Sequence, residues 1–358
     1  MTEKTPIKSL WLEEISEWMR SAGEPSYRDQ QIVNWIYEKR ARSFDQMLNL
    51  PQTLRMRLAE TFDFAEMATV RALGSADTTR KFLFQLHDGN LIEAVLIPAS
   101  PALYGSDSDR RTLCISTQVG CAYGCKFCAS GLDGWKRNLR ADEIVEQIIA
   151  VERESREHVD NIVFMGMGEP FANYENLMRA IQIINAPWGI GIGARRITVS
   201  TSGLVPQIQK LADQPLQIRL AVSLHGATDE VRDRIMPVNR KYNLDMLFDA
   251  CRYYTSRKKQ RITFEYILIA DVNDSEEQAR ELSKRAQEFE AKINLIPYNT
   301  VEDLDWSRPT ENQQERFLAV LRERGIAATL RREKGHDIAA ACGQLRLQTA
   351  RAMQPADA

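Results

Sequence analysis

The sequence predicts an α/β protein, an incomplete (β/α)₆ barrel preceded by a small N-terminal helical module and a β-hairpin extension. Strand-like and helix-like segments alternate between residues 113 and 331, which is typical of parallel strands joined by right-handed crossovers. Before residue 60, apolar residues recur at helical spacing, and residues 66–98 change to period two. We expect boundaries that give four parts: 1–62, 63–110, 111–335 and 336–358.

The first two parts follow from local signals. Residues 9–22 and 27–42 have the apolar spacing of amphipathic helices, and Pro51 introduces a third, short helix. Strands at 81–86 and 91–97 flank the turn sequence His-Asp-Gly-Asn, which predicts a hairpin.

The third part contains the barrel strands. They are expected at 113–117, 161–167, 196–200, 218–224, 262–269 and 291–296, with a further candidate at 327–331. Helices fill the intervals, for example at 141–154 and 275–290. A cysteine-rich loop directly after the first strand favours a partial barrel over a doubly wound sheet, because barrel chemistry collects at the C-terminal ends of the strands.

Composition narrows the class of protein. The 358 residues carry a net charge of −2, so any nucleic-acid footprint must be a local basic cluster. Six cysteines are too few and too clustered for a secreted disulfide framework. The first residues lack the apolar run of a signal peptide, and no stretch approaches the roughly 20 apolar residues of a membrane helix. We therefore expect a cytoplasmic enzyme without membrane contact.

Three cysteines, Cys121, Cys125 and Cys128, stand in a CxxxCxxC pattern within eight residues. Three thiolates on one loop can hold three irons of a [4Fe–4S] cluster and leave the fourth iron open, whereas electron-transfer ferredoxin sites use four cysteines. An open iron suits the amino and carboxylate groups of S-adenosyl-L-methionine, which a reduced cluster can cleave to a radical. The alternative is a structural zinc site, which would need a fourth ligand that this pattern does not supply.

Polar residues follow four other predicted strands. Gly168 and Glu169, in Gly-Met-Gly-Glu-Pro, could admit a ligand close to the backbone and bind the ammonium of a methionine moiety; a plain turn is the alternative. Ser200 could meet ribose or carboxylate, or cap a helix. The cofactor-binding candidates at the remaining two strand ends are Ser223, Leu224, His225 and Asn299. His225 is assigned a positioning role, and Asn299 could read an adenine edge.

The other three cysteines lie apart from this loop. Cys114 is on the first barrel strand, seven residues before Cys121, and Cys342 is in the C-terminal segment. Cys251 falls on an apparent helix face and is expected to be buried and inert.

These motifs together resemble the RlmN/Cfr family of radical-SAM RNA methyltransferases over nearly the whole chain. The matching runs are 118–128, 137–139, 166–170, 200–203, 223–225 and 337–345. The last run, together with Cys114, separates this family from other CxxxCxxC enzymes. The resemblance implies methylation of an adenine carbon, with carbon 2 as the leading interpretation, in 23S rRNA at the peptidyl-transferase centre and, for many bacterial members, also in tRNA beside the anticodon.

The resemblance also implies a two-stage reaction that uses two S-adenosyl-L-methionine molecules per turnover. Cys342 takes a methyl group from the first molecule by displacement, a covalent form of catalysis. Cleavage of the second generates a radical that activates this S-methyl group for addition to the adenine. Cys114 then attacks the sulfur of Cys342 and frees the product, leaving a transient disulfide that is compatible with the cytosol.

For the base that removes the ring proton, the family pattern points to Glu93. A carboxylate inside the apolar run Leu-Ile-Glu-Ala-Val-Leu-Ile is unusual, although an outward-facing strand position would also explain it.

The implied partners are 23S rRNA, tRNA, and an electron donor such as flavodoxin with its reductase, and we expect a monomer. The N-terminal module is expected to contact RNA. Methylation at carbon 8 of the same rRNA adenosine remains an alternative within the family, and a zinc-stabilised RNA-binding protein remains an alternative outside it. The stretch 99–110 looks longer than is usual for the family.

Overall fold

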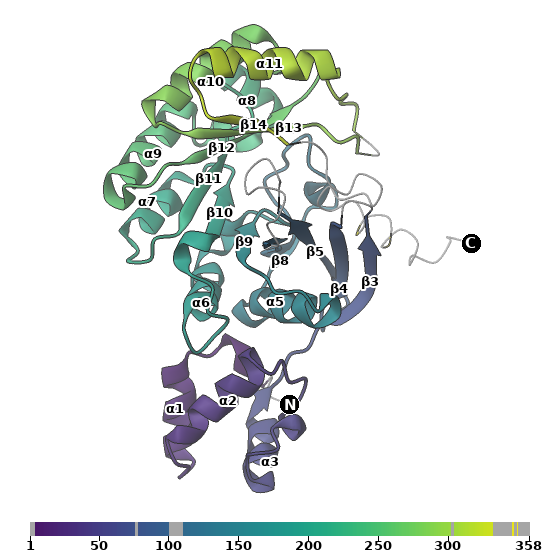
Figure 1. Cartoon of the computed structure of the whole chain (residues 1–358), viewed down its shortest axis with the longest axis vertical. Helices are drawn as coiled ribbons and strands as arrows, with labels where there is room; N and C mark the ends of the chain where they lie inside the picture. Colours follow the sequence, from purple (N-terminus) through teal and green to yellow (C-terminus); the bar gives the residue numbers. More distant parts are fainter. Residues whose placement is uncertain are drawn as a thin grey trace, which may run out of the picture.

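A mixed sheet of ten strands organises the protein, for which a computed structural model describes residues 4–75, 78–99, 110–301, 304–331, 346 and 349 (Figure 1). Its order is β14-β13-β12-β11-β10-β9-β6-β5-β4-β3. The strands from β6 to β14 in this sheet are mutually parallel. Their bounds are β6 Arg111–Cys114, β9 Asn161–Phe164, β10 Ile197–Thr201, β11 Arg219–Ser223, β12 Thr263–Leu268, β13 Lys292–Pro297 and β14 Ala328–Leu330.

The parallel strands lie in chain order, so every crossover steps in the same direction. Since such crossovers are right-handed, their helices fall on one side and the sheet curves around the other. A doubly wound sheet would reverse direction midway. The predicted incomplete barrel is therefore confirmed. The helices are α5 Ala141–Ser155, α6 Tyr174–Asn185, α7 Val205–Asp213, α8 Asp229–Ile235, α9 Leu244–Lys258, α10 Glu276–Glu288 and α11 Glu311–Glu323.

Alternation along the strands separates the helical side from the barrel interior. In β12, Phe264 packs edge-on against Phe248 of α9, and Tyr266 packs against Phe317 of α11. Ile267, the next residue after Tyr266, points to the opposite face of the strand and lines an interior cavity. The main apolar core thus lies between sheet and helices and leaves the interior for chemistry.

The predicted hairpin is confirmed, but it belongs to the same sheet as the barrel. Strands β4 (Arg80–Gln85) and β5 (Leu91–Pro98) pair antiparallel, and β5 continues onto β6. A third antiparallel strand, β3 (Ala68–Gly74), completes the edge. The inner face of β5 is therefore continuous with the inner face of the barrel.

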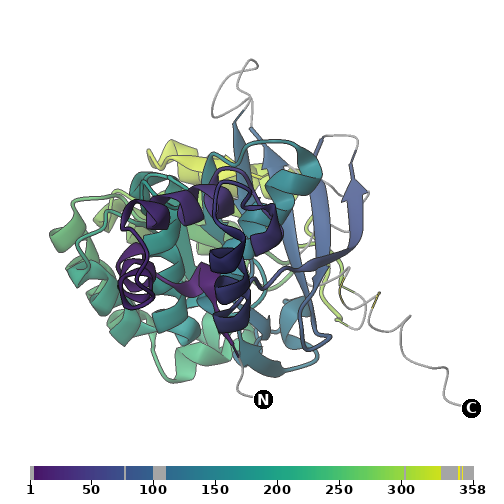
Figure 2. The same cartoon turned by 90° about the horizontal axis from the view of Figure 1, so that it is seen from below.

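The N-terminal module packs against the helical side of the barrel. Lys8 and Glu146 of α5 form an ion pair with both side chains fully buried, and Arg179 of α6 donates to the carbonyl of Ser9. Figure 2 shows the module in front of the helices, with the antiparallel strands beside it. The module comprises β1 Thr5–Pro6, α1 Leu12–Ser21, α2 Tyr27–Tyr37, α3 Gln52–Thr61 and β2 Phe62–Asp63.

The helix α2 ends five residues before its predicted end, because Arg40 adopts a positive φ of 54° that breaks the helix.

The remaining short elements of the described residues are β7 Gln118–Gly120, β8 Trp135–Asn138 and six 3₁₀ turns, η1 Ile7–Ser9, η2 Phe44–Gln46, η3 Ala129–Gly131, η4 Pro170–Asn173, η5 Ala194–Arg196 and η6 Pro237–Arg240. Within the described ranges, every helix is too short or too polar to cross a membrane.

Candidate active site

The CxxxCxxC loop is enclosed by the antiparallel pair β7 and β8, directly after the first barrel strand. Gly120 has φ of +75°, and a Cβ there would lie 1.9 Å from the carbonyl oxygen of Gly134. The Cys121 amide donates to that same carbonyl at 3.0 Å. Only glycine permits this close approach, so the loop that carries the three cysteines has a fixed entry and exit.

The three thiols of this loop interact electrostatically and are each partly exposed. Burial raises the pKa of Cys121 to about 12, and burial followed by the charges of Cys128 and Cys121 raises that of Cys125 further. Thiols in this state ionise readily only when a cation binds them.

The three cysteines of this loop fit a polynuclear cluster better than a single ion. Cluster ligands bind different irons, and three thiolates leave one iron open. A tetrahedral zinc site needs a fourth ligand, and the CxxxCxxC pattern supplies only three. Cys121, Cys125 and Cys128 therefore suit a [4Fe–4S] cluster.

Glu169, after β9, is a buried carboxylate oriented by backbone amides. Its oxygens accept from the amides of Phe171 at 3.0 Å and Ser202 at 2.7 Å. Burial raises the pKa of Glu169, and these hydrogen bonds oppose the rise. Gly168, at φ +98°, is required because a Cβ would lie 2.5 Å from the Gln118 side chain. The turn thus aims the carboxylate between two strand ends, where each oxygen keeps further acceptor capacity.

Ser200 and Ser223 are brought together across β10 and β11, with their hydroxyl oxygens 3.2 Å apart. Arg232 of α8, which is fully buried, donates to the carbonyls of Ser202, Ser223 and Leu224. Burial lowers its pKa to about 10, so it stays charged at neutral pH. The Leu224 side chain is in the apolar core, which leaves only its backbone to meet a cofactor.

His225 is held in one tautomer. Its Nδ1 accepts from the amide of Ile267 at 3.0 Å, so the proton is on Nε2. Burial, and then Arg232, lower its pKa to about 3. Its ring meets Phe127 of the cysteine loop edge-on, 4.9 Å between centroids. A neutral histidine that contacts the loop and β12 fits the predicted positioning role.

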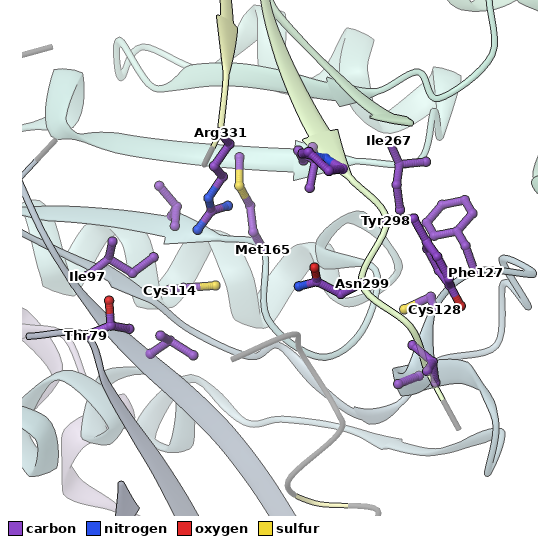
Figure 3. A pocket seen from close by; sticks show the side chains of 16 residues that line it. Thr79, Ile97, Cys114, Phe127, Cys128, Met165, Ile267, Tyr298, Asn299 and Arg331 are labelled. Carbon is purple, nitrogen blue, oxygen red and sulfur yellow. The ribbon is translucent and has the colours of Figure 1, made fainter. Parts of the chain in front are cut away.

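One cavity joins several of the predicted residues (Figure 3). Cys128 lies at one end, Cys114 lies toward the other, and Asn299 stands between them. Among the described residues, Asn299 Oδ1 is buried without a hydrogen-bond partner. Because an unpaired buried polar atom is costly, this oxygen indicates a polar ligand in the cavity.

Glu93 lies on the inner face of β5, 2% exposed. Its Oε2 is 3.0 Å from Nζ of Lys81 on β4, which is also fully buried. Its Oε1 accepts from the backbone amide of Arg346 at 2.5 Å. Val95, two residues along the same face, lines the cavity beside Cys114. The carboxylate therefore faces inward, and the outward-facing alternative is wrong.

Of the remaining two cysteines, Cys251 lies in a helix and Cys342 lies in the C-terminal part of the chain. Cys251 is fully buried on α9, as predicted, and burial raises its pKa to about 12. Cys342, and with it the proposed disulfide, lies outside the described residues, as does nearly all of 99–110. Near Cys342 in sequence, Arg346 donates through Nη1 to Asp133 at 2.7 Å.

Sequence reasoning missed Arg232 and Lys81. Arg232 shares an apolar helix face with Ile235 and Met236, and Lys81 stands in a strand beside Phe82 and Leu83. A basic residue inside an apolar pattern was the available signal in both cases.

Two families match different parts of the sequence. Residues 115–283 match the Radical SAM superfamily, and residues 7–64 match the ribosomal RNA large subunit methyltransferase N-terminal domain. The first implies S-adenosyl-L-methionine and a [4Fe–4S] cluster, in agreement with the cysteine loop.

Full-length relatives share both parts. A probable dual-specificity RNA methyltransferase RlmN 3 of Opitutus terrae is 55% identical over 98% of this chain and 96% of its own. A probable dual-specificity RNA methyltransferase RlmN of Akkermansia muciniphila is 53% identical over 94% of both chains. The crystal structure of a radical SAM methyltransferase from Sphaerobacter thermophilus, 45% identical, superposes with a TM-score of 0.89 over 95% of this chain and 98% of that one.

Proposed function

Because the chain belongs to the RlmN-type radical SAM methyltransferases, which act on RNA, we propose that it methylates carbon 2 of an adenosine in 23S rRNA. The proposal extends to the adenosine beside the tRNA anticodon, since relatives 55 and 53% identical are named dual-specificity enzymes. Membership in this enzyme family displaces the zinc-stabilised, non-catalytic alternative.

One observation carries the proposal: Cys128 and Cys114 line the same cavity. A cluster ligand alone would suit any radical enzyme of this superfamily. A second cysteine in the same cavity suits a reaction that must also resolve a sulfur-linked intermediate.

In the first stage, the Cys342 thiolate attacks the methyl carbon of S-adenosyl-L-methionine. The new S–CH₃ bond forms as the carbon–sulfonium bond breaks, and S-adenosylhomocysteine leaves with the bonding electron pair. This stage is needed because carbon 2 of adenine, between two ring nitrogens, is too electron-poor to attack the methyl group itself.

In the second stage, Cys121, Cys125 and Cys128 would hold the [4Fe–4S] cluster, which supplies the 5′-deoxyadenosyl radical from a second S-adenosyl-L-methionine. Glu169 would bind the ammonium of that molecule. Gly168, Ser200, Ser223 and Leu224 would line its site, Asn299 would accept from its adenine, and His225 would hold the loop in place. An electron carrier such as flavodoxin would deliver the reducing equivalents.

The 5′-deoxyadenosyl radical would take a hydrogen atom from the S-methyl group of Cys342, and the resulting S–CH₂ radical would add to carbon 2 to give the linked adenine. Near Cys114, Glu93 would accept the ring proton of this adduct. The electron pair of the C–H bond stays in the ring, and the one electron in excess would return to the cluster. The Cys114 thiolate then attacks the sulfur of Cys342. The sulfur–carbon bond breaks, and the carbon takes the electron pair and a proton to become the methyl group. The resulting disulfide must be reduced before the next turnover.

The target base must leave its stack to enter the cavity. The N-terminal module, residues 1–62, would hold the RNA that surrounds it, and the barrel, 111–335, would hold the base. Residues 336–358 would bring Cys342 to it, and 63–110 would supply Glu93. We propose that the enzyme acts as a cytoplasmic monomer.

The test uses anaerobically reconstituted protein with S-adenosyl-L-methionine, a reductant and fragments of 23S rRNA or tRNA. Mass spectrometry would score 5′-deoxyadenosine, S-adenosylhomocysteine and methyladenosine together. We expect 2-methyladenosine from wild type and from Cys251→Ala, and none from Cys342→Ala. The 8-methyl isomer would overturn the regiochemistry, and cofactor cleavage without RNA methylation would overturn the substrate.

A further inference from the structure

The strands β4 and β5 place a lysine and a glutamate on the inner face of the sheet. In their register, Lys81 is opposite Val95 and Glu93 is opposite Leu83, so the two charged residues are diagonal neighbours on one face. The distance from Lys81 Nζ to Glu93 Oε2 is 3.0 Å, and their side chains are 0% and 1% exposed. This is a complete burial of two opposite charges.

The pair has apolar residues on one side and residues that line the cavity on the other. Leu83 and Leu91 form a small separate cluster on the same face of these strands. Val95 and Cys114, paired across β5 and β6, line the cavity. The pair therefore lies between the apolar residues of this face and the residues that line the cavity.

Glu93 is also held from the C-terminal segment. The backbone amide of Arg346 donates to its Oε1, and the Arg346 guanidinium donates to Asp133 in the loop between β7 and β8. One oxygen of the carboxylate thus faces Lys81 and the other accepts from the amide of Arg346. This fixes the carboxylate from two directions.

A buried ion pair is a poor device for stability alone, because well-packed apolar residues of similar volume are often equally stabilising. A buried ion pair can also serve to join two parts of a protein, and the chain contains such a pair. Lys8 and Glu146 are also fully buried, but they join the N-terminal module to α5. The Lys81–Glu93 pair instead lies in one sheet that is already hydrogen-bonded, so it is not needed to join two parts.

We propose that Lys81 is a positioning residue for the reaction: it fixes the Glu93 carboxylate, in its charged form, where that carboxylate removes the ring proton from the sulfur-linked adenine. This rests on the proposed function and adds a group to it. Lys81 acts through Glu93 and makes no direct contact with the substrate. When the proton moves to Glu93, the ring keeps the electron pair and the ammonium then faces a neutral acid, which favours release of the proton.

The experiment uses wild type, Lys81→Met, Lys81→Arg and Glu93→Gln with RNA that carries deuterium at carbon 2 of the target adenosine. Products and covalent protein–RNA adducts would be separated on denaturing gels and weighed by mass spectrometry. For Lys81→Met we expect turnover to fall at least about 100-fold, the scale of lost general-base catalysis. We also expect an adduct that keeps its deuterium. Lys81→Arg, which keeps the charge, should recover much of the turnover.

Two further variants guard against a simple folding defect. Lys81→Met leaves Glu93 buried without its ammonium, which destabilises the fold; Lys81→Met with Glu93→Gln removes both charges. If Lys81 acts through Glu93, this double variant should be no slower than Glu93→Gln alone. Lys8→Met, the matched buried lysine, should lose stability without accumulating adduct.

The results can distinguish failure of the proposed role of Lys81 from failure of the proposed RNA methylation. Wild type that forms no methyladenosine on any RNA overturns both. Suppose that wild type methylates RNA and Glu93→Gln accumulates the deuterated adduct. A Lys81→Met enzyme with normal turnover, or with slow turnover and no deuterated adduct, then overturns the role of Lys81 alone.

Discussion

The two ends of the cavity are built by different means. At the proposed cofactor end, residues come from loops after parallel strands, and the carboxylate of Glu169 accepts from backbone amides. Near the proposed methyl-transfer end, Cys114 and Glu93 lie within strands, and the carboxylate of Glu93 is paired with an ammonium. Amides orient an acceptor and leave it capacity to bind a ligand, whereas a buried ammonium fixes the position of the carboxylate beside it. The difference predicts that each end can be disabled while the other still works.

The largest expected effect is at the cofactor end. Cys125→Ala should remove one of the three cluster ligands, so bound iron, brown colour and cleavage of S-adenosyl-L-methionine should all be lost. Iron analysis and 5′-deoxyadenosine assays on anaerobically reconstituted protein would measure this. Cys251→Ala, at a buried cysteine on α9, is the control and should keep all three. A variant lacking Cys125 that still cleaves the cofactor would remove this loop from the radical chemistry.

At the other end, Cys114→Ala should abolish multiple turnover but spare cofactor cleavage. Without its thiolate the linked adenine can lose its proton but cannot leave Cys342, so an adduct without the ring hydrogen should accumulate. Turnover should fall at least about 1,000-fold, as expected when a nucleophile is removed. Peptide mass spectrometry of nuclease-treated adduct would check it. Free methyladenosine at wild-type rates would break the proposed separation of the two ends.

Arg232 links the strand ends next to the proposed cofactor site through hydrogen bonds to their carbonyls. Arg232→Met should lower the free energy of unfolding by about 3 kcal/mol, because three carbonyls of neighbouring strand ends lose a buried charged donor. Arg234→Met, at an exposed position of the same helix whose guanidinium stacks on Trp306, should cost at most about 1 kcal/mol. Urea denaturation of both variants gives the comparison; equal losses would mean that Arg232 does not organise these loops.

The smallest effect is expected at the middle of the cavity. Asn299→Ala should raise the dissociation constant of S-adenosyl-L-methionine about 10-fold, the loss of roughly one hydrogen bond to a ligand. Thermal stability should change little, since Asn299 Oδ1 has no hydrogen-bond partner among the described residues. Isothermal titration of the reconstituted protein would measure the affinity, with Asn34→Ala on α2 as the control. Unchanged affinity would remove Asn299 from the cofactor site.

The two ends also differed in how far the sequence could predict them. Cys121, Cys125 and Cys128 lie within eight residues, and Glu169 and His225 follow strands at short, recognisable turns. Local order in the chain carries this information, since a loop after a parallel strand always emerges at the same edge. Lys81 and Arg232 gave only a weak signal, because their partners are separated from them in sequence and are chosen by strand register and by packing.

The sequence by itself determined the fold class, the cysteine loop and the family, because strand–helix alternation and short motifs are encoded within a few residues of each other. Only the tertiary structure decided that the hairpin continues the barrel sheet through β5 and β6. It also decided that Glu93 faces inward onto Lys81, and that Cys114 and Cys128 share a cavity. A one-residue change of register would turn Glu93 to the opposite face without altering the sequence pattern. The hydrogen bonds between strands therefore decided where this carboxylate points.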